Sequence, residues 1–98
     1  MAMHAAEVAP HVYKVVFENE RLRLLEVAMA PGATTELHSH PDYLVYALSD
    51  GTVRLADASG QSGEVEIHQG DTMWRDAEEH SATNTGPAEM RALFIEMK

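Results

Sequence analysis

The residues best suited to chemistry are two histidines, His38 and His40, in the stretch "PGATTELHSHPDYLVYALSDG". Alternate residues of a β-strand point to the same face, so both imidazoles would project together from backbone positions roughly 7 Å apart. Two imidazoles placed in this way can converge on one metal ion. A chain with six histidines often contains an H-x-H triplet by chance, so the surrounding sequence has to decide between a metal grip and ordinary strand residues.

The composition limits what such a site could bind. The 98 residues include 7 basic and 16 acidic side chains, and the net charge of -9 disfavours nucleic acid and anionic membrane surfaces as partners. Because there is no cysteine, disulfides, zinc thiolate sites and thiol nucleophiles are excluded. A metal would be held by imidazole and carboxylate, and the expected partner is a small-molecule substrate or ligand.

The chain is long enough for one domain with one modest core. Residues 1–15 are weakly patterned and are expected to form an N-terminal arm or a strand, possibly exchanged in a dimer, whereas residues 16–98 are expected to form a single domain. The beginning of the chain lacks the basic and apolar regions of a signal peptide, and no apolar run reaches the roughly 18 residues of a membrane span. We therefore expect a cytoplasmic location.

Short runs rich in Val, Leu, Ile, Tyr and Thr alternate with turn signals about every ten residues, which is typical of an all-β sandwich or barrel. The expected strands are Val12–Glu18, Leu22–Met29, Thr34–His40, Tyr43–Leu48, Thr52–Ala56, Gly63–His68, Thr72–Arg75, His80–Thr85 and Met90–Met97. No stretch shows sustained helical periodicity. The pair Asp50-Gly51 is the strongest β-hairpin signal.

Two stretches of the chain resemble the sequence motifs of the cupin superfamily. In the first motif, G-x5-H-x-H-x3-4-E-x6-G, the matching residues are Gly32, His38, His40 and Gly51. In the second, "QGDTMWRDAEEHSATNTG", they are Gly70, His80 and Asn84. The two matches occur in the right order and together span residues 32–86. The resemblance implies a cupin double-stranded β-helix, a jelly-roll-like antiparallel barrel, with a divalent metal inside.

Carried over to this chain, the resemblance makes His38, His40 and His80 the metal ligands. Leu44 occupies the usual position of the family's glutamate ligand, and His68 replaces a usual proline. Three neutral imidazoles would leave a divalent ion its full charge, which favours anionic chelating substrates. The ion could be Fe, Mn, Ni, Zn or Cu, and three-histidine cupins include the diketone-cleaving and thiol dioxygenases.

Three functions are therefore considered. The first is a metal-dependent enzyme of the three-histidine dioxygenase type that acts on a small chelating, anionic substrate. The second is a Lewis-acid isomerase or lyase of sugar-type substrates. The third is a binding module that holds a small ligand or a metal without turnover.

Other residues are weaker candidates for the site. Glu36 shares the strand phase of His38 and is an additional metal-ligand candidate, although a solvated side chain is the simpler interpretation. Tyr46 is expected to point into the barrel, and Tyr43 to lie at its mouth or outer face. Trp74 and Arg75 are further pocket candidates, the latter for a substrate carboxylate. The three remaining histidines, His4, His11 and His68, are expected to be ordinary surface or packing residues.

The assembly is predicted from size. A barrel of about a hundred residues has a limited core, and pairing of strand edges or packing of sheet faces would bury more apolar surface. We therefore expect a homodimer.

Overall fold

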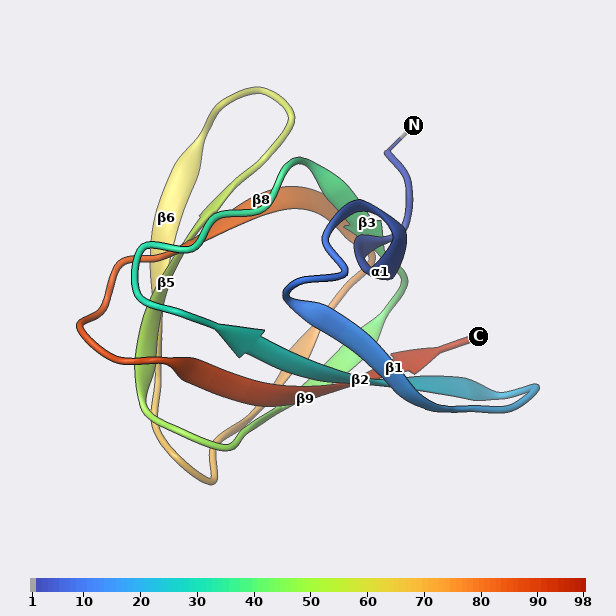
Figure 1. Ribbon diagram of the computed structural model, residues 1–98. Helices are drawn as coiled ribbons and strands as arrows, with labels where there is room; N and C mark the ends of the chain where they lie inside the picture. Colours follow the sequence, from blue (N-terminus) through green and yellow to red (C-terminus); the bar gives the residue numbers. More distant parts are fainter. Residues whose placement is uncertain (1) are drawn as a thin grey trace.

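The computed structural model describes residues 2–98 and is built almost entirely of β-strands (Figure 1). In chain order the elements are α1 (Ala5–Val8), β1 (Tyr13–Glu18), β2 (Leu22–Met29), β3 (His38–His40), β4 (Tyr43–Ala47), β5 (Gly51–Ala56), β6 (Ser62–Ile67), β7 (Thr72–Arg75), β8 (Glu78–Asn84) and β9 (Met90–Met97). The nine strands correspond to the nine expected from the sequence. The expected strand over residues 34–40 is shorter, because Thr34 forms only an isolated bridge to Thr83.

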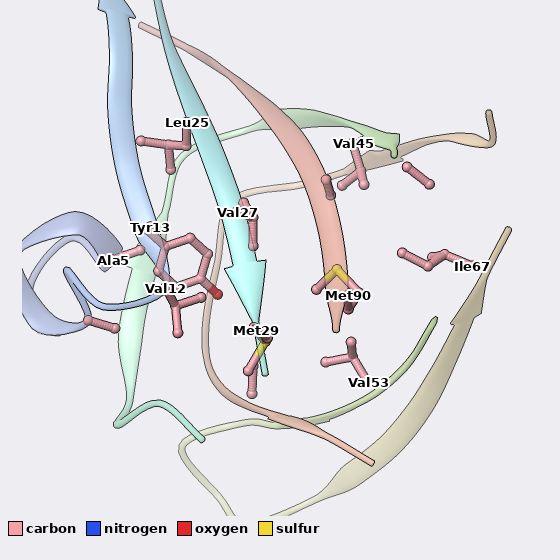
Figure 2. Packing of buried hydrophobic residues seen from close by; sticks show 14 of the residues in the cluster. Ala5, Val12, Tyr13, Leu25, Val27, Met29, Val45, Val53, Ile67 and Met90 are labelled. Carbon is pink, nitrogen blue, oxygen red and sulfur yellow. The ribbon is translucent and has the colours of Figure 1, made fainter. Parts of the chain in front are cut away.

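The strands form two antiparallel sheets. One has the order β1-β2-β9-β4-β7 and the other the order β3-β8-β5-β6. Apolar side chains from both sheets meet between them (Figure 2). This is the all-β double-stranded β-helix that the sequence predicted. Among residues 2–98 the structure has no helix long and apolar enough to cross a membrane.

The hairpin prediction at Asp50-Gly51 was wrong. The strands on either side, β4 and β5, belong to different sheets, so the chain crosses the barrel at this point. Glycine is needed here because of close packing, since a Cβ on Gly51 would lie 2.7 Å from Met90 Cγ. The hairpins of the structure are β1-β2 and β5-β6 instead.

The expected orientation of strand β4 was also wrong. Tyr43 is only 1% exposed and points into the barrel, whereas Tyr46 is 42% exposed and lies on the outer face. A period of two predicts which residues share a face but not which face is inside. Tyr43 is tolerated inside because its hydroxyl donates a hydrogen bond to Glu78 at 2.8 Å.

The N-terminal segment lies against the barrel of its own chain. His4 bridges Ser39 of β3, and the Ser39 N–H donates to the Met3 carbonyl at 2.8 Å. Ala5, the first residue of the short helix, and Ala9, its C-cap, are both fully buried. This docking brings residues from the start of the chain next to the strand that carries His38 and His40.

Candidate metal centre

Three histidines meet inside the barrel. His38 and His40 lie on β3 and His80 lies on β8, where antiparallel pairing sets His38 directly opposite His80. All three are buried, at 0 to 3% exposure. One ring nitrogen of each lies within 4.8 Å of the ring nitrogens of the other two. The structure thus brings together the three histidines that the sequence motifs marked.

Hydrogen bonds fix the orientation of two of the rings. His38 Nδ1 lies 2.8 Å from the Glu36 carbonyl and His40 Nδ1 lies 2.7 Å from a Glu96 carboxylate oxygen, so both nitrogens must donate. A neutral imidazole carries one N–H, and the Nε2 atoms of His38 and His40 therefore present lone pairs. Burial lowers the pKa of His38 to about 4 and also lowers the pKa of His40, which keeps both in the form that binds metals.

His80 is held less firmly than the other two. Its Nδ1 lies 3.1 Å from Glu78 Oε1, but the contact is too poorly aligned to count as a hydrogen bond. Neither of its ring nitrogens has a hydrogen-bond partner in the described chain. The ring can therefore offer a lone pair to the centre while its other nitrogen turns toward Glu78.

These histidines fit a divalent ion. The Nε2 atoms of all three are buried and without a hydrogen-bond partner among residues 2–98. A buried polar atom without a partner costs about 1–3 kcal/mol, so three of them side by side need an explanation. Imidazole nitrogen is a common ligand of zinc, copper, iron and nickel, and a metal bound at this point would satisfy all three.

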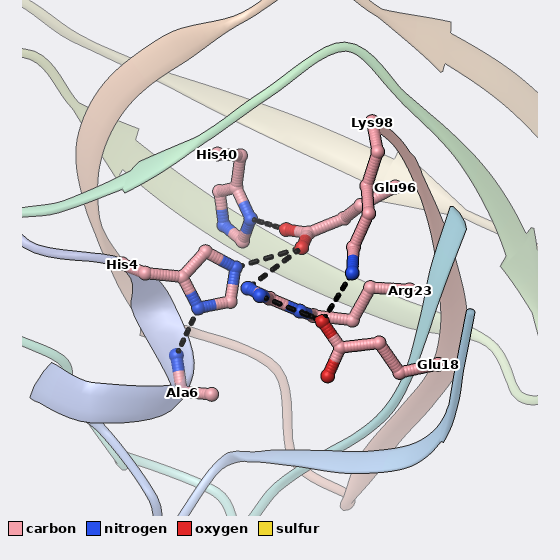
Figure 3. Close-up of polar contacts among 7 residues, drawn as sticks. All are labelled: His4, Ala6, Glu18, Arg23, His40, Glu96 and Lys98. Atoms are coloured by element: carbon pink, nitrogen blue, oxygen red, sulfur yellow. Dashed lines mark hydrogen bonds and ion pairs between the residues drawn. The ribbon is translucent and has the colours of Figure 1, made fainter. Parts of the chain in front are cut away.

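Glu96 supports one side of the centre (Figure 3). It is 1% exposed, and its two carboxylate oxygens accept hydrogen bonds at 2.7 Å from His4 Nε2 and His40 Nδ1. Burial acts to raise the pKa of Glu96, but the two imidazole donors outweigh it and lower the pKa to about 2. His4, His40 and Glu96 could also be read as a ligand set. Their facing atoms already bond one another, so we interpret them as a hydrogen-bonded chain.

Glu78 supports the other side. It accepts hydrogen bonds from the Tyr43 hydroxyl and from two nitrogens of Arg75, and it faces His80. Burial would raise the pKa of Glu78, but these donors outweigh it and lower it well below the usual range. The Arg75 guanidinium is therefore engaged by a carboxylate of its own chain and is not free to hold a substrate carboxylate by its fork.

Because Leu44 replaces the family's glutamate ligand, the sequence predicted a metal site with no carboxylate to offset the charge of the ion. The carboxylates of Glu78 and Glu96 change this expectation. Three isolated imidazoles would leave a bound ion its full charge, but Glu78 and Glu96 each place a carboxylate against the outer nitrogen of a ligand histidine. Such carboxylates offset part of the ion's charge and raise the basicity of the ring. The preference for anionic ligands is therefore weaker than three isolated imidazoles would give.

A small, mostly apolar cavity of about 50 Å³ lies next to His80. Its polar lining residues are Tyr13, Tyr43, Arg75 and His80, and its apolar ones include Val45, Met73 and Phe94. This volume accommodates about three or four water molecules or a few non-hydrogen atoms. Near the barrel mouth lie two shallow depressions that, unlike the apolar cavity, are lined in part by acidic side chains: Asp57, Glu64, Glu78 and Glu79.

The other sequence candidates lie outside the centre. Glu36 has an exposed side chain and contributes its backbone carbonyl to His38 instead of a carboxylate ligand. Trp74 is 52% exposed on the outer face, like Tyr46, and donates to Asp76. Neither aromatic residue lines the cavity.

Sequence reasoning missed four residues of the site, Tyr13, Glu78, Glu96 and His4, the last of which had been assigned to the surface or to packing. A signal existed for Glu96, which is a lone acidic residue inside the apolar run "ALFIEM". The others gave no comparable signal, since Tyr13 and His4 lie in the weakly patterned start of the chain and Glu78 is one of several acidic residues just before His80.

Comparison with known proteins agrees with this geometry. The family model described as "Cupin domain" matches residues 25–96. A solved cupin domain from Bordetella pertussis Tohama I is 29% identical, with a TM-score of 0.80 and coverage of 89% of this chain and 92% of that one.

More distant structures share the fold. A double-stranded β-helix protein from Klebsiella pneumoniae is 20% identical, with a TM-score of 0.69, and the match covers 88% of this chain and 75% of that one. An RmlC-like cupin from Methanocaldococcus jannaschii is 9% identical, with a TM-score of 0.68 and coverage of 88% and 78%. No curated protein matches the sequence. The family match over most of the chain, together with the two sheets and their buried histidines, shows that this chain belongs to the cupin family.

Proposed function

We propose that this cupin is a metal-dependent enzyme that binds a divalent ion through His38, His40 and His80. We further propose that it acts on a small chelating substrate in the manner of a three-histidine dioxygenase. The observation that carries the proposal is the set of three buried Nε2 atoms without hydrogen-bond partners. When bound, the ion would supply Lewis acidity and open coordination positions, and iron would add redox chemistry.

The chain itself would orient the substrate and exclude water. The cavity beside His80 is mostly apolar, which suits dioxygen and the apolar part of a small substrate. Tyr13 points its hydroxyl into the space between the sheets (Figure 2), and this hydroxyl has no hydrogen-bond partner among residues 2–98. It is free to donate to a substrate oxygen. Burial raises its pKa, so it stays a donor at neutral pH.

The same cavity argues against the sugar isomerase. A sugar carries several hydroxyl groups that need hydrogen-bond partners when buried, and the Tyr43 and Arg75 groups are already engaged by Glu78. The charge of the mouth also limits the substrate, because its carboxylates disfavour strongly anionic molecules. A small chelating substrate with a single negative charge fits both observations.

The first test is metal content by mass spectrometry of protein purified without chelator. The comparison is with His38→Ala/His40→Ala/His80→Ala and with the control His68→Ala, which removes an exposed imidazole. The expected result is near-stoichiometric metal in the parent and the control, and none in the triple variant. Equal emptiness of all three proteins after reloading with iron, manganese, nickel, copper and zinc would refute the metal site.

The second test addresses the reaction. Iron-loaded protein is expected to consume oxygen with a diketone, a thiol or a hydroxy acid, and Tyr13→Phe should reduce the rate without removing the metal. Activity under argon with zinc or nickel would favour the Lewis-acid alternative. Metal binding without turnover under either condition would favour the binding module.

The chain is also proposed to form a homodimer through the outer face of the five-stranded sheet. Strand register aligns one apolar residue from each strand in a continuous row across this face: Phe17, Leu24, Ile95, Leu44 and Trp74. Phe17 and Trp74 are each 52% exposed in the single chain. A monomeric mass by light scattering at working concentration would contradict the dimer. The cytoplasmic location stays a prediction from the sequence.

A further inference from the structure

The N-terminal histidine is oriented by its own helix. His4 caps α1, and its Nδ1 lies 3.1 Å from the Ala6 backbone N–H, so Nδ1 must accept. A neutral ring that accepts at Nδ1 carries its proton on Nε2. His4 Nε2 is therefore a donor, and it points at Glu96 Oε1 at 2.7 Å (Figure 3).

Glu96 connects the oriented His4 ring to the metal centre. Because His4 holds one carboxylate oxygen, the other is directed at His40 Nδ1 at 2.7 Å. The carboxylate is 1% exposed, so water cannot readily take the place of either partner. His40 Nδ1 must donate, and its Nε2 lone pair is left for the centre. The backbone amide of Ala6 is thus connected to the metal centre through His4, Glu96 and His40.

We propose that His4 is a positioning residue for the metal centre: through Glu96 it holds His40 in its metal-binding orientation, so that docking of residues 2–9 and metal affinity are coupled. This inference rests on the proposed metal site. If His4 acts in this way, the N-terminal segment contributes to metal affinity although it supplies no ligand.

Coupling of this kind works in both directions. If the docked segment increases metal affinity by some factor, the metal must stabilise the docked segment by the same factor. The segment is otherwise held by few contacts, chiefly the buried side chains of Ala5 and Ala9 and two hydrogen bonds, from the Ser39 N–H to the Met3 carbonyl and from the Ala2 N–H to the Glu79 carboxylate. Elements held by few contacts open most readily, so a ligand-dependent change in their opening is measurable.

The affinity arm uses zinc and a competing chromophoric chelator. His4→Ala should weaken zinc binding about 10-fold, within the range observed when a hydrogen-bond partner of a ligand histidine is lost. His4→Gln should restore much of the affinity, because its amide N–H reaches the place of Nε2. The matched control is His11→Ala, which removes an exposed imidazole from the same region; its Nε2 lies 3.3 Å from the Thr34 carbonyl and makes no hydrogen bond to the metal centre.

The reciprocal arm uses amide hydrogen exchange. Zinc should slow exchange at Ala6 and Ser39 in the parent protein about as much as His4→Ala weakens zinc binding. In His4→Ala, zinc should have little effect at Ser39. Wild-type affinity in folded His4→Ala, or zinc-independent exchange at both amides in the parent, would overturn the inference while leaving the metal site intact.

A third arm needs no metal. Without zinc, Glu96→Gln should speed exchange at Ala6 and shift the ¹⁵N resonances of His40 toward a mixture of tautomers, whereas His11→Ala should do neither. Unchanged exchange and an unchanged His40 tautomer would overturn the inference. A parent protein that binds none of iron, manganese, nickel, copper and zinc would instead overturn the proposed function and the affinity arm with it, and the metal-free arm separates these failures.

Discussion

The two carboxylates that flank the histidine centre, Glu96 and Glu78, support their neighbouring histidines in different ways. On one side Glu96 is buried, bonds His40 at 2.7 Å and has its second oxygen held by the neutral His4 ring. On the other, Glu78 is 22% exposed on its side chain, lies 3.1 Å from His80 out of line, and is held by the Arg75 cation and the Tyr43 hydroxyl.

The difference separates rigid support from adjustable support. Glu96 keeps its full negative charge beside two neutral rings, and the nearest cation, Arg23, lies 4.0 Å away. The charge of Glu78 is offset by direct contact with Arg75, and no hydrogen bond among residues 2–98 fixes the ring of its histidine. We infer that the Glu96 side sets the geometry of the centre, while the Glu78 side lies where the barrel opens and can adapt to a ligand.

The largest change in the free energy of unfolding is expected from removal of the Glu96 carboxylate. Glu96→Ala leaves the N–H groups of buried His40 and partly buried His4 without acceptors and, at about 1–3 kcal/mol for each, should lower the free energy of unfolding by about 2–6 kcal/mol. Glu78→Ala should cost only about 1–2 kcal/mol, because water reaches this partly exposed side. Urea denaturation of both variants at pH 7 provides the measurement. Equal losses would contradict the distinction between the two sides.

Acid should act on the metal-free centre in two stages. The folded pKa of His38 is about 4 against about 6.5 when unfolded, so the unfolded chain binds protons first. Stability should therefore fall as the pH drops from about 6.5 to 4, by about 3 kcal/mol for this group. Glu96, with a folded pKa of about 2, contributes stability that is lost only from about pH 4.5 downward.

Urea titrations at several pH values separate these stages. His38→Gln should flatten the upper stage and leave the lower one. A stability that stays constant between pH 7 and pH 5 would show that the imidazoles are not held neutral, and would remove one reason for assigning them to a metal.

A smaller loss of stability is expected when Arg75, the cation that contacts Glu78, is replaced. Arg75→Met removes the two-nitrogen contact with Glu78 and should cost about 1–2 kcal/mol in unfolding free energy. Zinc affinity should change less than 10-fold, because the geometry is set on the other side of the centre. Arg75→Lys keeps the charge but lacks the fork, and it should recover part of the stability. A larger loss of zinc affinity than in Glu96→Gln would reverse the assignment of the two sides.

The smallest effect on zinc affinity serves as a control for all of these. In Gly51→Ala the new Cβ would lie 2.7 Å from Met90 Cγ and 3.1 Å from Met90 Cβ, at the root of a buried side chain, and the overpacking should cost about 1–3 kcal/mol. Zinc affinity should stay within about twofold of the parent, since neither residue contacts the centre. Gly63→Ala, where an added Cβ meets nothing within 4 Å, is the matched substitution and should show no close-packing penalty. Reduced zinc affinity in Gly51→Ala would mean that lost stability alone weakens the site.

Much of the fold could be read from the sequence. The alternation within "LRLLEVAM" and "MRALFIEM" matches β2 and β9, and the spacing of His38, His40 and His80 marked the three residues that meet. The alternation of side chains was less informative where both faces of a strand carry apolar or aromatic residues. The alternation in "YLVYA" is compatible with either face inside; in the structure Tyr43, Val45 and Ala47 face the core, and Glu78 accepts the hydrogen bond of the buried Tyr43 hydroxyl.

The strands, the cupin motifs and the residue types that can hold a metal are recognisable in the sequence, because strand period and motif spacing act over a few neighbouring residues. That Asp50-Gly51 crosses between sheets, and that His4 joins a centre 34 residues away through Glu96 at the other end of the chain, depends on the folded arrangement. Burial and hydrogen-bond partnership depend on which distant strands pair, and no local pattern carries that information.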